Sequence, residues 1–450
     1  MMRKRSGNRK KLNQMQFIAS GFLAMIIIGT LLLMLPISSS NGEWTSPLSA
    51  LFTATSASCV TGLVVVDTFT HWSLFGQIII LALIQIGGLG FITIGVGFAV
   101  AFQKHIGLRQ RDLLKESVNA IDLGGIIRLW KNIVKGTAVF EGAGAILLAI
   151  RFIPRFGIGR GIYFGIFHSV SAFCNAGFDL MGINEEYSSL VSYVSDPYVN
   201  IVICALIILG GLGFLVWRDV WEKRFRWREF TLHTKIVLSV TAFLIISGSV
   251  LFYILECNAS MKGMDQETKI LASVFGAVTP RTAGFNTVNN AALSSGGKLL
   301  SIALMFIGGS PGSTAGGIKT TTIAVLVVYV ISMVRNSSGV NMFKRRVSDE
   351  VVKKASLVFL INLFLVIVAT MIIVATTSFN IEDTLVETVS AVSTVGMSVG
   401  ITRGLGVAGQ IACIVLMYIG RTGSMTFALS IMNNQEKPAV KYPEEKIAIG

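Results

Sequence analysis

Charged side chains are scarce in this chain. Asp, Glu, Lys and Arg make up 14% of its 450 residues, whereas hydrophobic residues make up 52%. Water-soluble domains carry about 25% charged residues, because their surfaces face water. The composition therefore excludes an ordinary soluble protein and predicts an integral membrane protein.

Cysteine and histidine are too few and too scattered for metal or redox chemistry. The five cysteines show no CxxC spacing, and the four histidines show no metal-ligand spacing. We therefore expect neither a disulfide framework nor a zinc site. Because no segment resembles a nucleophile, a carboxylate pair or a cofactor-binding motif, we expect that the chain is no enzyme and binds no cofactor of its own.

A signal-peptide cleavage pattern is missing too, so the apolar run at 17–35 is predicted to remain as a first membrane helix. The net charge of +14 comes from basic clusters beside apolar segments, which belong in the cytoplasm and do not indicate a nucleic-acid partner. Six Lys or Arg residues lie in each of 1–13, 104–131, 218–235 and 335–354. Arg151, Arg155 and Arg160, near the outer face of the second unit, are an exception to this trend.

The apolar pattern predicts eight spanning helices with both termini in the cytoplasm. Outward spans are expected near 17–35, 133–153, 236–255 and 355–376, and inward spans near 74–102, 199–217, 299–334 and 407–432. Between them lie segments of half the spanning length, at 48–57, 161–173, 269–278 and 383–391. Such short apolar helices, each followed by a glycine turn, are typical of re-entrant segments. Ser46 and Pro47 are expected to start the first of them.

One stretch occurs four times. The copies read SASCVTGL (56–63), SAFCNAGF (171–178), VTPRTAGF (278–285) and SAVSTVGM (390–397). Their glycines lie 115, 107 and 112 residues apart, which indicates duplication of one large unit. We therefore expect four fused repeats of outer helix, pore helix and inner helix around one pore. Their bounds are 14–110, 111–228, 229–346 and 347–433, between an N-terminal segment, 1–13, and a C-terminal tail, 434–450.

The repeated turn is interpreted as an ion filter. Rings of backbone carbonyls replace the water shell of a cation, and glycine lets the backbone approach the axis with positive φ. The alternative, close packing of helices, suits a single glycine better than four equivalent ones. The predicted filter residues are Val60, Thr61, Gly62, Asn175, Ala176, Gly177, Thr282, Ala283, Gly284, Thr394, Val395 and Gly396.

A second landmark follows on the inner helices, as Gly-Gly at 87–88, 210–211 and 308–309 and as Gly420-Arg421 in the fourth repeat. Arg421 either pairs with an acid such as Glu141 or places a positive charge below the filter. The third repeat continues as an irregular segment, 308–319, which is either a packing kink or a gate; no phosphate-binding loop is indicated. The predicted gate residues are Gly308, Gly309, Ser310, Gly312, Ser313, Thr314, Ala315, Gly316, Gly317, Lys319 and Arg421.

Other polar residues carry weaker signals. Asp67, Asp179 and Glu387 are candidates for attracting cations at the outer mouth, with no firm function assigned. His168 is expected to be a hydrogen-bonded structural residue, and Asp265 and Asp383 are expected to cap short helices.

Taken together, these residues resemble the Trk/Ktr/HKT superfamily of potassium transporters, and most of all its bacterial Ktr membrane subunits. The motifs that carry the resemblance are IQIGGLGF (84–91), TPRTAGFN (279–286), GGSPGSTAGGIK (308–319) and YIGRTG (418–423). The resemblance implies potassium binding at the filter residues, and glycine rather than serine at position 62 matches the potassium-passing members. It also implies a gate formed by the third inner-helix loop and Arg421.

The resemblance further implies a homodimer in the bacterial plasma membrane, on a ring of cytosolic regulatory subunits of the RCK type. Those partner subunits would bind ATP or ADP, and sodium is a possible activator. We therefore expect a gated, channel-like potassium uptake protein. The alternatives are a proton- or sodium-coupled symporter, which the lack of a carboxylate or histidine relay disfavours, and the ion-binding subunit of a potassium-pumping ATPase.

Overall fold

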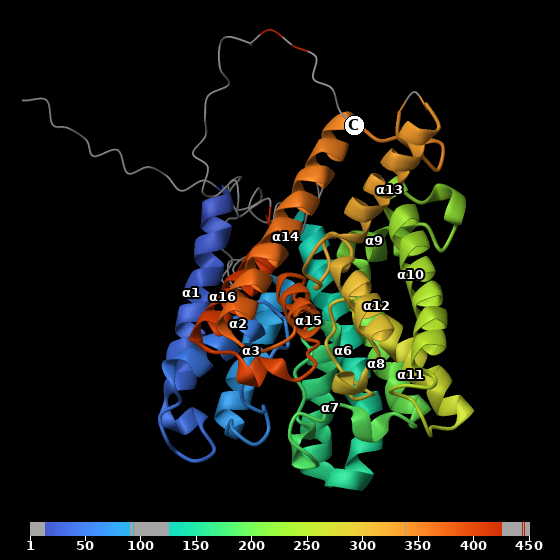
Figure 1. Cartoon of the computed structure of the whole chain (residues 1–450). Helices are drawn as coiled ribbons and strands as arrows, with labels where there is room; N and C mark the ends of the chain where they lie inside the picture. The colour runs from blue at the N-terminus through green and yellow to red at the C-terminus, as the bar shows by residue number, and fades with distance from the viewer. Residues whose placement is uncertain are drawn as a thin grey trace, which may run out of the picture.

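Four long helices frame the molecule in the computed structural model, which describes residues 14–90, 93, 126–337, 339–424, 443 and 445. They are α1 (Gln14–Met34), α6 (Ile126–Phe156), α10 (Leu232–Glu256) and α14 (Asp349–Thr376), and they run up and down the view in Figure 1. All four are long and apolar enough to cross a membrane. The four predicted outward helices are thus confirmed as helices, each within a few residues of its predicted bounds except α6 and α14, which are longer at their starts.

Four short helices lie among the long ones, as predicted. They are α2 (Pro47–Ser58), α7 (Ile158–Phe173), α11 (Gln266–Val278) and α15 (Ile381–Val392), and each packs against the long helix that precedes it. The side-chain hydroxyl of Ser46 accepts a hydrogen bond from Ser49 N (3.2 Å) at the start of α2, so the predicted cap is confirmed. Asp265 caps α11 in the same way.

The prediction that Asp383 caps a short helix is wrong. Asn380 is the cap of α15, and its side chain accepts a hydrogen bond from Asp383 N (2.8 Å). The Asp383 carboxylate instead forms an ion pair with Lys298 (2.7 Å), which joins α15 to the inner helix of the preceding repeat.

The inner helices are shorter than predicted, because each of three ends at a glycine with positive φ. They are α3 (Leu74–Leu89), α8 (Pro197–Leu212) and α16 (Val407–Thr422). The glycines that follow them are Gly90 (φ 83°), Gly213 (φ 97°) and Gly423 (φ 88°). After Gly213 the chain turns by 92° into α9 (Phe214–Glu222), so the single helix predicted near 199–217 is in fact two helices. Most of the predicted continuation of α3 to 102 and of α16 to 432 lies outside the described residues.

The third inner helix breaks at the same level in a different way. It consists of α12 (Ser295–Phe306), an irregular segment at 307–319 that we call the central loop, and α13 (Thr320–Val334). A short antiparallel hairpin follows, β1 (Asn341–Met342) with β2 (Arg345–Arg346). Short 3-10 turns complete the described elements: η1 (Pro36–Ser38), η2 (Met181–Ile183), η3 (Val191–Tyr193), η4 (Trp227–Glu229), η5 (Asn290–Ala292) and η6 (Ile401–Gly404).

The repeats are joined in a cycle by their helix contacts. Each inner helix packs against the short helix of the next repeat: α3 on α7, α8 on α11, α12 on α15, and α16 back on α2. The short helices are mostly buried in this cycle, whereas the long helices expose apolar side chains such as Leu31, Ile146, Ile246 and Phe364. Exposed apolar bands on the longest helices are what a lipid environment requires. The bent pair of α8 and α9 is together also long and apolar enough to cross a membrane. The remaining apolar helices α3, α12, α13 and α16 are shorter.

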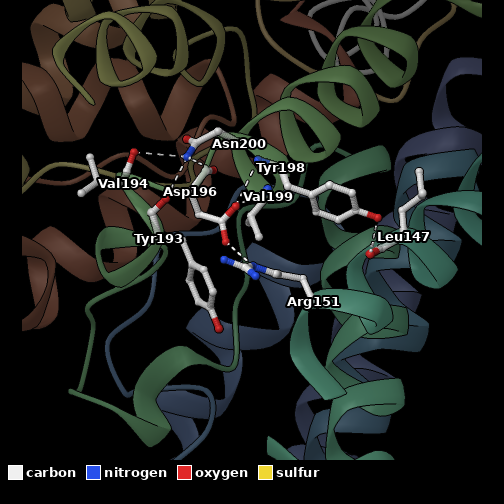
Figure 2. A network of polar contacts seen from close by, with 8 residues as sticks. All are labelled: Leu147, Arg151, Tyr193, Val194, Asp196, Tyr198, Val199 and Asn200. Atoms are coloured by element: carbon white, nitrogen blue, oxygen red, sulfur yellow. Dashed lines mark hydrogen bonds and ion pairs between the residues drawn. The ribbon is translucent and has the colours of Figure 1, made fainter. Parts of the chain in front are cut away.

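A polar network explains one of the arginines that break the charge trend. Arg151 on α6 forms an ion pair with Asp196 (2.6 Å), and the carboxylate of Asp196 caps α8 by accepting from Tyr198 N (3.1 Å) (Figure 2). The Tyr198 hydroxyl donates to Leu147 O on α6 (3.0 Å), and the Asn200 side chain closes the turn with three main-chain carbonyls (Figure 2). The start of α8 is thereby tied to α6.

A second polar network supports the third repeat and generates a prediction. The fully buried carboxylate of Glu256, at the end of α10, accepts hydrogen bonds from the hydroxyl and main-chain N–H groups of Ser260 and Ser294. Replacing Glu256 by alanine leaves these donors unpaired, so we expect the free energy of unfolding to fall by roughly 3 kcal/mol. Glu267→Ala, an exposed acid at the start of α11, should change it by less than about 1 kcal/mol. Thermal unfolding of both variants in detergent measures this difference, and equal effects would contradict the assignment.

Candidate functional site

The four glycine turns meet and form a closed ring. Each glycine lies against the main-chain carbonyl oxygen of the residue that precedes the next glycine, so that a Cβ atom at any of them would collide with that oxygen. The pairs are Gly62 with Ala176, Gly177 with Ala283, Gly284 with Val395, and Gly396 with Thr61. Since the last pair returns to the first turn, all twelve predicted filter residues are brought together. We call the turns 60–62, 175–177, 282–284 and 394–396 the glycine ring.

All four turns share one backbone conformation. The glycines have φ values of 95°, 68°, 81° and 90°, and the residue two positions before each glycine also has positive φ although it carries a side chain. Those residues are Val60 (57°), Asn175 (59°), Thr282 (74°) and Thr394 (50°). Positive φ is rare for β-branched residues and persists only where the surroundings enforce it. The strain is therefore a shared feature of the ring rather than a local accident.

Buried hydroxyl groups hold the turns in this conformation. Gly62 N donates to the Ser56 side chain and Gly396 N to the Ser390 side chain, both at 3.0 Å. In the other two turns the hydroxyl donates instead, from Ser171 to Phe178 O and from Thr279 to Phe285 O, both at 2.6 Å.

No role is assigned to these hydroxyl residues from the sequence, although the repeated stretch contains a signal for them. A serine opens three of the four copies of the repeated stretch, at 56, 171 and 390. In the third copy the position holds Val278, and Thr279 supplies the hydroxyl one residue later.

The ring is surrounded by the carboxyl ends of the short helices and supported from below by the second landmark glycines. A Cβ atom on each of Gly87, Gly210 and Gly420 would collide with a carbonyl oxygen in the last turn of a short helix. The oxygens belong to Ser58, Phe173 and Val392, respectively. Because a helix carboxyl end carries roughly half a negative charge, the four ends favour a cation at the ring.

A cavity of about 430 Å³ opens on one side of the ring, and we call it the mouth cavity. Its lining includes Gly62, Gly177 and Gly284 together with Asp67 and Asp179, so two of the three acids proposed at the mouth are placed there.

The remaining polar candidates are internal. Glu387 is fully buried, accepts hydrogen bonds from the hydroxyls of Ser398 and Thr402, and does not line the cavity. His168 is also fully buried; its ring contacts Phe164 O (2.8 Å) and accepts from Leu180 N (3.3 Å), which confirms its structural role.

The central loop lies against the other side of the ring. A Cβ atom on Gly316 would collide with the Thr394 hydroxyl, and one on Gly317 would lie 2.9 Å from Cα of Ser393. Further hydrogen bonds fix the loop to the second repeat, from Thr314 Oγ1 to Phe173 O (3.0 Å), from Ser310 N to Gly211 O (3.0 Å) and from Phe214 N to Gly312 O (2.7 Å). The loop is therefore an ordered structure directly beneath the ring.

Two cationic side chains are bound to this loop through its carbonyl oxygens. Arg421 donates to Thr314 O and to the carbonyls of Gly87 and Gly88 at the end of α3. Lys319 donates to Ala315 O (2.7 Å) and Gly316 O (3.3 Å). Three successive carbonyls of the loop are thus occupied by positive charges.

The alternative in which Arg421 pairs with Glu141 is wrong. The described residues contain no ion pair between the two, and the Glu141 carboxylate instead accepts a hydrogen bond from the Gln85 side chain (3.1 Å). The partners of Arg421 are the main-chain oxygens of the central loop and of α3.

Comparison with known proteins gives consistent matches over the whole chain. The model of the TrkH family, described as cation transport protein, matches residues 2–441. The chain is 43% identical over 449 residues to the potassium/sodium uptake protein NtpJ of Enterococcus hirae, covering 98% of each chain. It is 41% identical over 440 residues to the Ktr system potassium uptake protein B of Bacillus subtilis, covering 97% of this chain and 96% of that protein.

A solved structure shares the fold. The crystal structure of the potassium transporter TrkH from Vibrio parahaemolyticus superposes with a TM-score of 0.71 at 17% sequence identity, covering 96% of this chain and 87% of that chain.

The hydroxyl groups behind the glycine ring generate a second prediction. Ser56→Ala removes the acceptor for the buried Gly62 N–H, so we expect a loss of about 2 kcal/mol in the free energy of unfolding. Ser58→Ala, two residues away on α2, removes a buried hydroxyl without a hydrogen-bond partner among the described residues and should be nearly neutral. Thermal unfolding in detergent compares the two, and a larger effect of Ser58→Ala would refute the assigned role of Ser56.

Proposed function

This chain belongs to the TrkH family of cation transport proteins, a family of membrane transporters rather than of enzymes, and we propose that it carries potassium ions into the cell through the glycine ring. The observation that carries the proposal is the closed contact cycle in which each glycine faces a carbonyl of the next turn. Such a ring offers main-chain oxygens to a dehydrated cation without a fixed charge that would trap it.

Potassium is proposed as the ion for two reasons. The relatives from Enterococcus hirae and Bacillus subtilis are named for potassium/sodium uptake and for potassium uptake, respectively. In addition, all four turns carry glycine, the residue that the potassium-passing members of the superfamily have in the first turn. The ligands would be the carbonyls of the twelve ring residues, and the acids of the mouth cavity would attract cations to its entrance.

The proposed orientation follows from charge. The basic clusters at 218–235 and 335–354 lie beyond the inner helices, whereas the mouth cavity lies beyond the ring on the other side. The positive-inside tendency then directs the mouth cavity outward and both termini into the cytoplasm of a bacterial cell. With α3, the bent pair of α8 and α9, the interrupted α12 and α13, and α16 as inward passages, the chain would cross the membrane eight times.

We propose that the central loop and Arg421 form the gate. The loop lies directly under the ring, and its carbonyls already hold two cationic side chains. A potassium ion leaving the ring would meet these positive charges, so passage requires the loop to move. A loop of small residues without regular structure can rearrange at low cost in packing.

Control by partners is proposed from the name of one relative. The Bacillus subtilis protein is a component of a Ktr system, and we propose that this chain likewise forms a homodimer on a ring of cytosolic nucleotide-binding subunits. ATP or ADP would bind to those subunits, and sodium would act as an activator.

A coupled symporter is the second candidate. The observation that favours it is Glu141, an acid on α6 whose carboxylate lies 3.1 Å from the Gln85 side chain on α3 near the ring. If a proton or sodium ion bound at Glu141 were coupled to transport, potassium flux would depend on the gradient of that coupled ion. Rubidium uptake into liposomes, driven by a rubidium gradient alone, separates the two candidates when proton and sodium movement is measured with it. A symporter carries a proton or sodium ion inward with each rubidium ion, whereas the channel-like protein moves rubidium without either.

The filter assignment predicts a loss of function from an added side chain. In Gly396→Ser or Gly284→Ser, the new Cβ atom collides with a carbonyl of the neighbouring turn. We expect potassium and rubidium uptake in liposomes to fall at least tenfold, or the preference for potassium over sodium to be lost. Gly142→Ser on α6 is the matched control, since nothing lies within 4 Å of its Cβ position. Unchanged flux and selectivity in both ring variants would sink the assignment.

The gate assignment predicts a gain of flux. Deleting residues 312–317 removes the obstruction, and Arg421→Gln weakens the bonds that hold it, so both should raise rubidium influx several-fold. Arg345→Gln, an exposed arginine on β2, serves as the control for loss of one positive charge. If influx through the deletion variant and through Arg421→Gln is unchanged while the proteins are present in normal amount, the loop is not the gate.

A further inference from the structure

A second cavity, of about 390 Å³, lies between α6 and α9, away from the glycine ring. Its lining residues on α6 lie in the first half of that helix, whereas the second half reaches the network at Asp196 on the mouth side. The cavity is therefore at the end of the molecule that carries the basic clusters. Its apolar walls are Leu129, Ile133, Val139, Phe140, Phe214 and Trp217.

The edge of this cavity carries a net positive charge, because its lining residues include two basic residues and one acid, Glu222. Lys135 from α6 and Arg218 from α9 line it, and both are exposed. Among the described residues Lys135 has no acidic partner within 4.0 Å, and Arg218 has only the exposed Glu222 at 3.8 Å. Both positive charges are thus available to an anionic group at the entrance.

The helix α9 has the features of an element at the membrane surface. It leaves the apolar helix α8 at 92°, so it runs along the bilayer if α8 crosses it. Phe214 and Val216 on it are buried against the protein, whereas Trp221 is 88% exposed beside Arg218 and Lys223. Exposed tryptophan next to basic residues is typical of the interface between acyl chains and headgroups.

We propose that this cavity binds a phospholipid with an anionic headgroup. Its acyl chain fills the apolar space between α6 and α9, and its phosphate pairs with Lys135 and Arg218. A soluble anion alone does not fit as well, because most of the lining is apolar and would remain uncovered. The bilayer supplies a ligand with both chemical parts at the position of the cavity.

The bound lipid would also act on the central loop, a consequence that rests on the gate proposed above. Phe214 is one of the residues that line this cavity, and its main-chain N–H donates to Gly312 O of the loop (2.7 Å). Trp217, on the same cavity wall, donates to Leu209 O (3.1 Å), and its ring lies 5.6 Å from that of Phe173 at the end of α7. A lipid that holds α9 in place therefore holds the loop beneath the ring.

Lipid binding by the purified full-length protein tests the site without any transport assay. Native mass spectrometry and thermal unfolding in detergent are measured with added phosphatidylglycerol or phosphatidylcholine. We expect phosphatidylglycerol to bind and stabilise the wild-type protein. The double variant Lys135→Gln/Arg218→Gln should bind it about 25-fold more weakly, about fivefold for each charge removed. Arg345→Gln/Lys353→Gln removes the same charge from exposed positions outside the cavity and should bind like the wild type.

A second variant tests the apolar part of the site. Val139→Trp fills the cavity without changing charge, and we expect it to lose bound phosphatidylglycerol as well. The proposal is overturned if phosphatidylglycerol binds the double variant or Val139→Trp as tightly as the wild type. It is also overturned if glycerol phosphate or inorganic phosphate stabilises the protein as much as the lipid does, since the site would then select a soluble anion.

The effect on the loop is tested by rubidium influx in liposomes of phosphatidylcholine, with and without phosphatidylglycerol. Wild-type influx should differ at least twofold between the two membranes, and influx through the double variant should be equal in both. If the lipid binds but wild-type influx does not change, the coupling to the loop is refuted while the site stands. A wild type that binds the lipid but conducts no rubidium in either membrane would refute the proposed function and leave the binding result intact.

Discussion

The contact between each glycine and the carbonyl oxygen of the next turn is the constraint on which the structure depends. Gly62, Gly177, Gly284 and Gly396 must all lack a side chain for the four turns to approach one another. That approach in turn requires the short helices to end together and the inner helices to pass close beneath them, which the landmark glycines Gly87, Gly210 and Gly420 allow. This one cycle of contacts thus determines where small residues occur in the ring, beside the ends of the short helices and on the inner helices.

The cycle is symmetric at the ring and asymmetric below it. The inner helices of the first, second and fourth repeats end at a glycine with positive φ at one level. In the third repeat the inner helix continues as the central loop. The fourth replaces a landmark glycine with Arg421, and this side chain reaches the loop of the third repeat and the end of α3 in the first. In the proposed function a cation would need equivalent ligands in the ring but only one obstruction below it, so symmetry and its loss would serve different parts of the same path.

Breaking the inner helices at glycine has a further consequence in the second repeat. The turn at Gly213 directs α9 away from the axis of α8. As a result, Phe214 on α9 both contacts the central loop and lines the apolar cavity. The loop is therefore connected through α9 to the cavity that we propose as a lipid site. This connection places a membrane-facing element within one hydrogen bond of the proposed gate.

The sequence by itself determined the repeated unit. The long helices, the half-length helices and the four turns follow from local apolar length and from glycine at equal spacing, because both properties depend on residues close together in the chain. The cap at Ser46 and the structural role of His168 were predicted for the same reason. Only the tertiary structure decided what distant residues do to one another. It showed that Asp383 pairs with Lys298 instead of capping its helix, that Arg421 binds carbonyls rather than Glu141, and that Gly213 bends its span by 92°. A carbonyl oxygen carries no signature in the sequence, and most of the contacts that build this site are made to carbonyl oxygens.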